Sequence, residues 1–210
     1  NIKGGLKAIG TLTFGAGNSG NVQIRTPRLE MTAGGQVDTS TFGSGAGGSL
    51  EVQANQVTLS GGASLGSVAK GSGAGGIIRV NARGSLRIIG RVAGEENPLS
   101  ENSYISADSM NTGQTGDIHS TTHYLNVDGR FLSMEAAGLA DARSIMIEAD
   151  SVIFQNGGGI VSDTFGGHAG GNIILKVAGD LTVKGRKSMV TGTSAYFNLE
   201  IDTMQSGISS

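Results

Sequence analysis

The sequence predicts an all-β protein, a parallel β-helix, on three observations. Gly-rich segments begin at Gly15, Gly43 and Gly71, at a constant interval of about 28 residues. Runs of about six residues that alternate apolar and polar side chains fill each interval, which is the period of a strand rather than a helix. Aligned at the repeat spacing, the runs place apolar residues above one another. Such a unit buries its apolar face by stacking on its neighbours.

Each coil of about 28 residues is expected to contain three strands whose inward residues form ladders. We expect six to seven coils in one domain over residues 1–210, with the right-handed sense that parallel crossovers nearly always have. The first ladder is Val22, Leu50, Ile78, Ile118, Ile145 and Ile173; the second is Leu29, Val57, Leu86, Leu125, Val152 and Leu181; the third is Val37, Leu65, Ile105, Leu132 and Ile160.

The Gly-rich segments are expected at a corner of the coil. Glycine suits a tight corner because it adopts positive φ and leaves no Cβ between stacked coils. The position before each segment is filled in turn by Phe14, Phe42, Lys70, Met110, Ala137 and Phe165. We predict that Phe14, Phe42 and Phe165 form a structural stack along this corner.

Two segments break the repeat and are predicted to be loop excursions. Residues 91–103 interrupt one coil between its second and third strands, and residues 186–205 leave from the same place in a later coil. The alternative for the second segment is that Ser188–Thr191 is the third strand. Loops on solenoids often carry specific contacts, so Tyr196 and Phe197 are candidates for contact with a partner.

The repeat begins and ends in the middle of a coil, without a polar cap at either end. Open ends of this kind indicate either a segment of a longer solenoid or a subunit that associates end to end with its neighbours.

Composition argues against several classes of function. The formal net charge is −2 and no basic field is present, so we expect no nucleic-acid partner. No stretch approaches the roughly 20 apolar residues of a membrane span, so we expect no membrane insertion. Cysteine is absent, which removes thiol catalysis and cysteine-ligated metals. We expect no enzyme activity, no catalytic residues and no cofactor.

One metal candidate remains in the third-strand alignment. Asp108, Glu135 and Asp163 occupy equivalent outward positions on successive coils, and carboxylates are ligands that Ca²⁺ prefers. The alternative is that these acids are ordinary solvated surface residues, because a slip of one residue would turn them to the other face.

The stretch GAGNSGNVQIRTPRLEMTAGGQVDTSTFGSGAGGSLEVQANQVTLSGGASL, Gly15 to Leu65, resembles the repeats of filamentous-haemagglutinin-like exoproteins. These are large bacterial adhesins exported by two-partner secretion, and the resemblance extends over most of the chain. It implies a secreted, right-handed β-helical rod at the cell surface. Its role would be attachment to host cells, to neighbouring cells or to glycans, aggregation, or the formation of a surface coat. Two alternatives are an extracellular filament subunit and a polysaccharide lyase or hydrolase.

Overall fold

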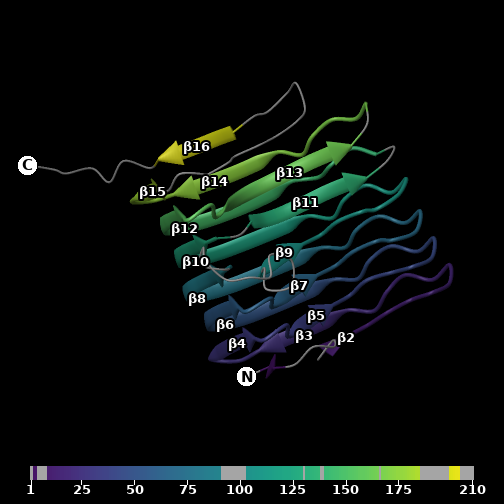
Figure 1. Ribbon diagram of the computed structural model, residues 1–210, viewed down its shortest axis with the longest axis horizontal. Helices are drawn as coiled ribbons and strands as arrows, with labels where there is room; N and C mark the ends of the chain where they lie inside the picture. The colour runs from purple at the N-terminus through teal and green to yellow at the C-terminus, as the bar shows by residue number, and fades with distance from the viewer. Residues whose placement is uncertain are drawn as a thin grey trace, which may run out of the picture.

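The computed structural model describes residues 2–3, 9–90, 103–129, 131–137, 140–165, 167–184 and 199–203. These residues form strands and turns and contain no helix. Every strand pairing among them is parallel. The strands stack in a column that follows the order of the chain (Figure 1). The predicted fold class, a β-solenoid of stacked parallel coils, is therefore confirmed.

Two sheets run along this column, and each turn of the chain passes through both. The larger sheet contains, in spatial order, β1 (Ile2–Lys3), β4 (Arg28–Thr32), β6 (Leu50–Ser60), β8 (Ile78–Ile89), β10 (Ile118–Asp128), β12 (Ile145–Gln155), β14 (Ile173–Val177) and β16 (Leu199–Thr203). In the same sheet β3 (Val22–Arg25) pairs with β6, and β15 (Leu181–Lys184) pairs with β12. The smaller sheet contains β13 (Gly159–Phe165), β11 (Phe131–Ala137), β9 (Tyr104–Ser106), β7 (Ser64–Gly66), β5 (Gln36–Asp38) and β2 (Ile9–Gly10).

The first and second predicted strands of a coil are often a single strand. They are continuous in β6, β8, β10 and β12, and separate in β3 and β4 and in β14 and β15. Between Ala82 and Ser85, β8 carries one residue more than its neighbours β6 and β10. A bulge of this kind bends a sheet without ending its pairing. Two of the three expected faces are thus parts of one bent sheet.

The repeat spacing is about 28 residues where no insertion interrupts it, as in the pairing of Val22 with Leu50 and of Leu50 with Ile78. The pairing of Ile78 with Ile118 spans a longer stretch of chain. The additional residues lie between β8 and β9, where the sequence predicts the excursion 91–103. Residues 91–102 themselves lie outside the described part of the chain.

The second predicted excursion is wrong in its extent. Residues 199–203 of the segment 186–205 form β16, which pairs with β14 as the first strand of a further coil. The cause is the alternation of Leu199 to Thr203, which continues the first ladder beyond Ile173 at a slightly shorter spacing than in the earlier coils. The alternative third strand, Ser188–Thr191, lies outside the described residues.

About five turns are complete within the described residues, fewer than the six to seven expected. The first coil, of which β1 and β2 are described, and the coil that begins with β14, which has no described third strand, are both incomplete in the described residues. These two coils account for the difference.

The apolar ladders form the core in the predicted register. Leu50, Ile78, Ile118 and Ile145 are fully buried, as are the second-ladder residues from Val57 to Val152. Each such side chain stabilises the fold by roughly 1.5–3 kcal/mol before the entropy of ordering the chain is subtracted. Near the Gly-rich corner the interior is polar instead. There Ser67 Oγ donates to the Gly48 carbonyl at 2.9 Å.

The Gly-rich corners are close-packed along the column. A Cβ on Gly43 would lie 1.8 Å from the carbonyl oxygen of Gly15, and a Cβ on Gly71 would lie 1.9 Å from that of Gly43. We expected positive φ at the Gly-rich corners, but the described glycines there do not have it. Positive φ occurs instead at the corner between the second and third strands, for example at Gly61 and Asn156. Crowding, and not backbone handedness, therefore requires glycine at the Gly-rich corner.

Candidate functional site

An exposed row of side chains runs along the edge of the Gly-rich corner. It consists of Phe14, Phe42, Lys70 and Met110, which we call the corner strip. Each residue directly follows one of four residues whose backbones form parallel β-bridges from coil to coil: Thr13, Thr41, Ala69 and Ser109. The backbone amides of Phe42, Lys70 and Met110 each donate a hydrogen bond to the carbonyl of the bridge residue one coil earlier, at 2.7–2.8 Å. Backbone pairing therefore fixes the strip at the coil spacing.

Three side chains of the corner strip, those of Phe14, Phe42 and Lys70, contact one another along the column. The rings of Phe14 and Phe42 stack with their centroids 4.8 Å apart and an interplanar angle of 14°. Lys70 Nζ lies 4.7 Å from the centroid of the Phe42 ring, a cation–π contact. Phe14 is 72% exposed, Met110 53% and Phe42 37%. The strip thus presents an apolar, aromatic surface with one ammonium group beside it.

The predicted third member of the stack, Phe165, ends β13. Its backbone pairs with that of Ala137 in β11, so both hold their predicted places in the repeat. The side chain of Phe165 lies outside the described part of the structure. The structure brings together Phe14 and Phe42, and the contribution of Phe165 stays a prediction.

The register places two of the three predicted acids side by side. Glu135 pairs with Asp163 between β11 and β13, although their side chains lie outside the described residues. Asp108 follows β9, and one of its carboxylate oxygens accepts a hydrogen bond from Ser106 Oγ. The described side chains contain no group of three metal-ligating residues. The Ca²⁺ site remains a prediction.

Tyr196 and Phe197, the predicted partner contacts, lie outside the described residues.

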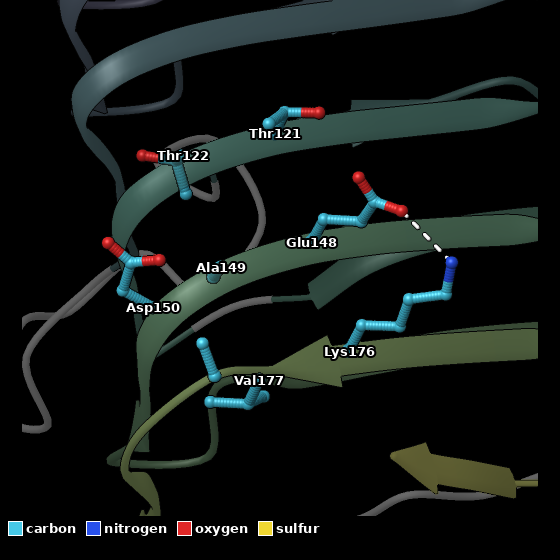
Figure 2. A pocket seen from close by; sticks show the side chains of 8 residues that line it. Thr121, Thr122, Glu148, Ala149, Asp150, Lys176 and Val177 are labelled. Carbon is cyan, nitrogen blue, oxygen red and sulfur yellow. Dashed lines mark hydrogen bonds and ion pairs between the residues drawn. The ribbon is translucent and has the colours of Figure 1, made fainter. Parts of the chain in front are cut away.

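A groove lies on the outer face of the larger sheet, where β10 and β12 bend and β14 ends. Its volume is about 370 Å³, and its lining is Thr121, Thr122, Glu148, Ala149, Asp150, Lys176, Val177 and Ala178. Figure 2 shows Glu148 and Lys176 pointing toward each other from adjacent strands, and Lys176 Nζ lies 3.0 Å from Glu148 Oε1. Asp150 pairs with Nδ1 of His123. Each carboxylate of the groove therefore has a basic partner.

Sequence reasoning missed these charge pairs, although the repeat could have revealed them. Glu148 and Lys176 lie 28 positions apart and occupy neighbouring register positions. His168 and Asp141, at 3.4 Å, follow the same spacing within one residue. In a solenoid the spatial neighbour of a residue is one coil away, so opposite charges at the coil spacing predict ion pairs.

A further polar cluster lies on the first coils. Gln23 Nε2 donates to Glu51 Oε2 at 2.7 Å, and Gln53 Nε2 donates to the other oxygen of the same carboxylate. These two hydrogen bonds, that from Gln23 first, lower the pKa of Glu51, because they stabilise the ionised form. Arg25 and Arg79 act in the same direction.

No helix long and apolar enough to cross a bilayer occurs among the residues the structure describes. Comparison with models of protein families, with curated proteins and with solved structures finds no match to this chain.

Proposed function

We propose that this chain is a rigid, non-enzymatic segment of a secreted bacterial adhesive protein, with the corner strip as its contact surface. The single observation that carries the proposal is the row of exposed Phe14, Phe42 and Met110 beside Lys70. Contiguous exposed apolar residues of this kind indicate an interaction site. Location at the cell surface is supported by the resemblance of Gly15–Leu65 to filamentous-haemagglutinin-like repeats.

The rest of the column suits a scaffold. Parallel pairing is continuous from β1 to β16 in the larger sheet, so bending the rod would break hydrogen bonds in several coils. A stiff rod holds the corner strip in a straight line, with its members at the strand spacing of about 4.8 Å. Several weak contacts in a fixed line act together, which raises the overall affinity for a repetitive surface.

The chemistry of the strip favours acidic glycans as the partner. An aromatic ring offers an apolar face to the C–H groups of a sugar, and the ammonium of Lys70 offers a positive charge to a carboxylate. Lys70 is exposed at the surface while lying over the Phe42 ring. A polyuronate would present both features along a repeating chain.

Binding of the purified chain to surfaces coated with alginate, with neutral dextran as reference, tests this function. We expect binding to alginate, and Phe42→Ala should weaken it about tenfold, as truncation of an aromatic anchor does. Tyr104→Ala is the matched control because Tyr104 is an exposed aromatic residue on β9, outside the strip. Equal binding by wild type and a Phe14→Ala/Phe42→Ala double variant, both folded by circular dichroism, would refute the assignment.

A further inference from the structure

Exposed arginines gather on the outer face of the larger sheet. Arg79, Arg83 and Arg87 follow one another along β8 at intervals of four residues, and all three are exposed. We call these three residues the arginine row. At about 3.3 Å per residue, neighbouring members lie about 13 Å apart along the strand. Arg25 on β3 and Arg28 on β4 are also exposed, two coils before β8.

An irregularity of the sheet displays the middle member of the row. Between Ala82 and Ser85, β8 carries one residue more than β6 and β10. Of the two residues there, Gly84 lies against the preceding coil, because a Cβ on it would be 3.0 Å from the carbonyl oxygen of Asn55. Arg83 is therefore the additional residue, and its side chain is exposed. A bulge of this kind can direct a side chain toward a ligand.

The arginine row differs from other basic side chains of the column in its partners. Arg143 and Lys176 each pair with an acid one coil earlier, at 3.3 and 3.0 Å. The side chains of the arginine row form no ion pair or hydrogen bond with the described part of the chain. The register neighbours of Arg87, for example, are Thr58 and Asn126, which carry no charge.

The acids nearest to these arginines are already engaged. Glu51 is the register neighbour of Arg79, but two glutamine amides donate to its two carboxylate oxygens. Arg79 also lowers the pKa of Glu51, with less effect than these hydrogen bonds, so it lies within electrostatic range without forming an ion pair. Glu30 pairs with Arg28 at 3.4 Å. The guanidinium donors of the row thus remain available to a ligand.

The surface between the arginines is polar. Asn81 and Ser85 lie on β8 between members of the row, and Gln53 and Gln56 hold the same register positions on β6. These positions offer no aromatic platform on which a base or a sugar ring could stack. Arginine together with asparagine, glutamine and serine is the set of side chains that binds phosphate oxygens and the groups beside them.

We propose that the arginine row binds a flexible polyol phosphate chain, in which phosphodiesters alternate with hydroxyl-bearing carbons. Each guanidinium binds a phosphate through two parallel N–H donors, and Asn81 and Ser85 bind the hydroxyls in between. A glycerol phosphate repeat has six backbone bonds, twice the three of a peptide residue, and extends over roughly 7 Å. Every second phosphate therefore meets an arginine.

The shape and charge of the site both fit such a ligand. A flexible chain can follow the bend of β8 between Arg79 and Arg87, whereas a flat bilayer surface cannot. The formal net charge of the protein is −2, so the attraction comes from this local surface. The inference goes beyond the proposed adhesive function and does not depend on the corner strip.

Fluorescence anisotropy of labelled poly(glycerol phosphate), titrated with the 210-residue chain at low ionic strength, tests the proposal. We expect saturable binding that weakens as salt is added, because exposed charges are screened. Arg79→Gln/Arg83→Gln/Arg87→Gln should weaken binding at least about tenfold, since three exposed contacts of a few-fold each multiply. Lysine at the same three positions keeps the charge without the planar fork, so it should restore only part of the affinity.

A second triple variant controls for total charge. Arg143→Gln/Lys176→Gln/Lys184→Gln removes three positive charges from later coils, and it should bind within about twofold of wild type. Circular dichroism checks that both triple variants are folded. Absence of binding by wild type, or equal losses in the two triple variants, overturns the proposal.

Two further measurements define the ligand and separate the surfaces. An oligodeoxythymidylate with the same number of phosphates should bind more weakly, because its bases find no stacking platform, and tighter binding of the oligonucleotide would overturn the choice of ligand. Phe14→Ala/Phe42→Ala should bind poly(glycerol phosphate) as wild type does. Its alginate binding reports on the corner strip, so failure of the proposed function is distinguishable from failure of this inference.

Discussion

Substitution of Gly45 by alanine probes the crowding at the Gly-rich corner. The new Cβ would lie 2.0 Å from the carbonyl oxygen of Gly17 and 2.7 Å from the amide nitrogen of Asn18. Both neighbours are backbone atoms, so rotation of a side chain cannot relieve the clash. The two coils must separate by about 1 Å before the contact reaches the 3.0 Å that real Cβ atoms require.

The free-energy change follows from the bonds that this separation stretches. Ser19 N donates to Ala46 O at 2.9 Å, and Ala46 N donates to Asn18 Oδ1 at 2.9 Å, both across the same gap. Loss of each bond destabilises by about 1 kcal/mol, and overpacking adds about 1–3 kcal/mol. Gly45→Ala should therefore lower the free energy of unfolding by about 3–5 kcal/mol.

Urea denaturation of dilute protein measures this difference, and Gly17→Ala is the control. Gly17 holds the same place in the motif one coil earlier, where a Cβ has open space. Its substitution should leave stability unchanged or raise it by about 0.4–1 kcal/mol through the unfolded chain. A Gly45→Ala variant as stable as Gly17→Ala would refute the crowding argument, because crowding is the feature that separates the two sites.

Three further substitutions test individual positions. Ser120→Val should raise the free energy of unfolding in urea by about 1 kcal/mol, since it removes a buried hydroxyl that has no hydrogen-bond partner; a loss of stability would contradict this. Ala33→Asn should stabilise by about 0.5–1 kcal/mol in the same assay, because Ala33 has a φ of 53° that asparagine tolerates better, as Asn156 does at the equivalent corner; no gain would argue against strain at this corner. Gln23→Ala should raise the pKa of Glu51 toward its ordinary value in a carboxyl NMR titration, since its hydrogen bond is the main cause of the lowering; an unmoved pKa would exclude that cause. The ionised Glu51 stabilises the fold above the pKa of the unfolded chain, and this contribution is lost as the pH falls through the lowered pKa of the folded state.

The apolar ladders could be predicted from the sequence because the repeat itself supplies the long-range contacts. Once Leu50 is aligned with Ile78, their side-by-side position follows from the coil spacing, and the structure pairs them. The same reasoning places Phe14 over Phe42, whose rings stack. In most folds contacts of this range depend on tertiary packing, which periodicity does not encode.

Other features depend on backbone geometry that a residue pattern does not record. The two predicted strands of a coil fuse into one in β6, β8, β10 and β12, and the few residues between the two alternating runs resemble a turn when read as sequence. Read as sequence, the glycines of the Gly-rich corner suit either close packing or positive φ. The structure separates the two causes, because the described glycines at this corner are crowded by the preceding coil and do not have positive φ. The pattern assigns Leu199–Thr203 to a loop because the spacing from Ile173 to Leu199 is shorter than in the earlier coils.

The charge pairs show that the coil spacing governs the outer surface as well as the core. Glu148 pairs with Lys176 one coil later, and Asp117 pairs with Arg143 at 3.3 Å, again between adjacent coils. Exposed pairs of this kind contribute little to stability, about 0–1 kcal/mol each, so their energetic effect within the column is small. They do restrict register, because a slip by one residue would separate every pair at once.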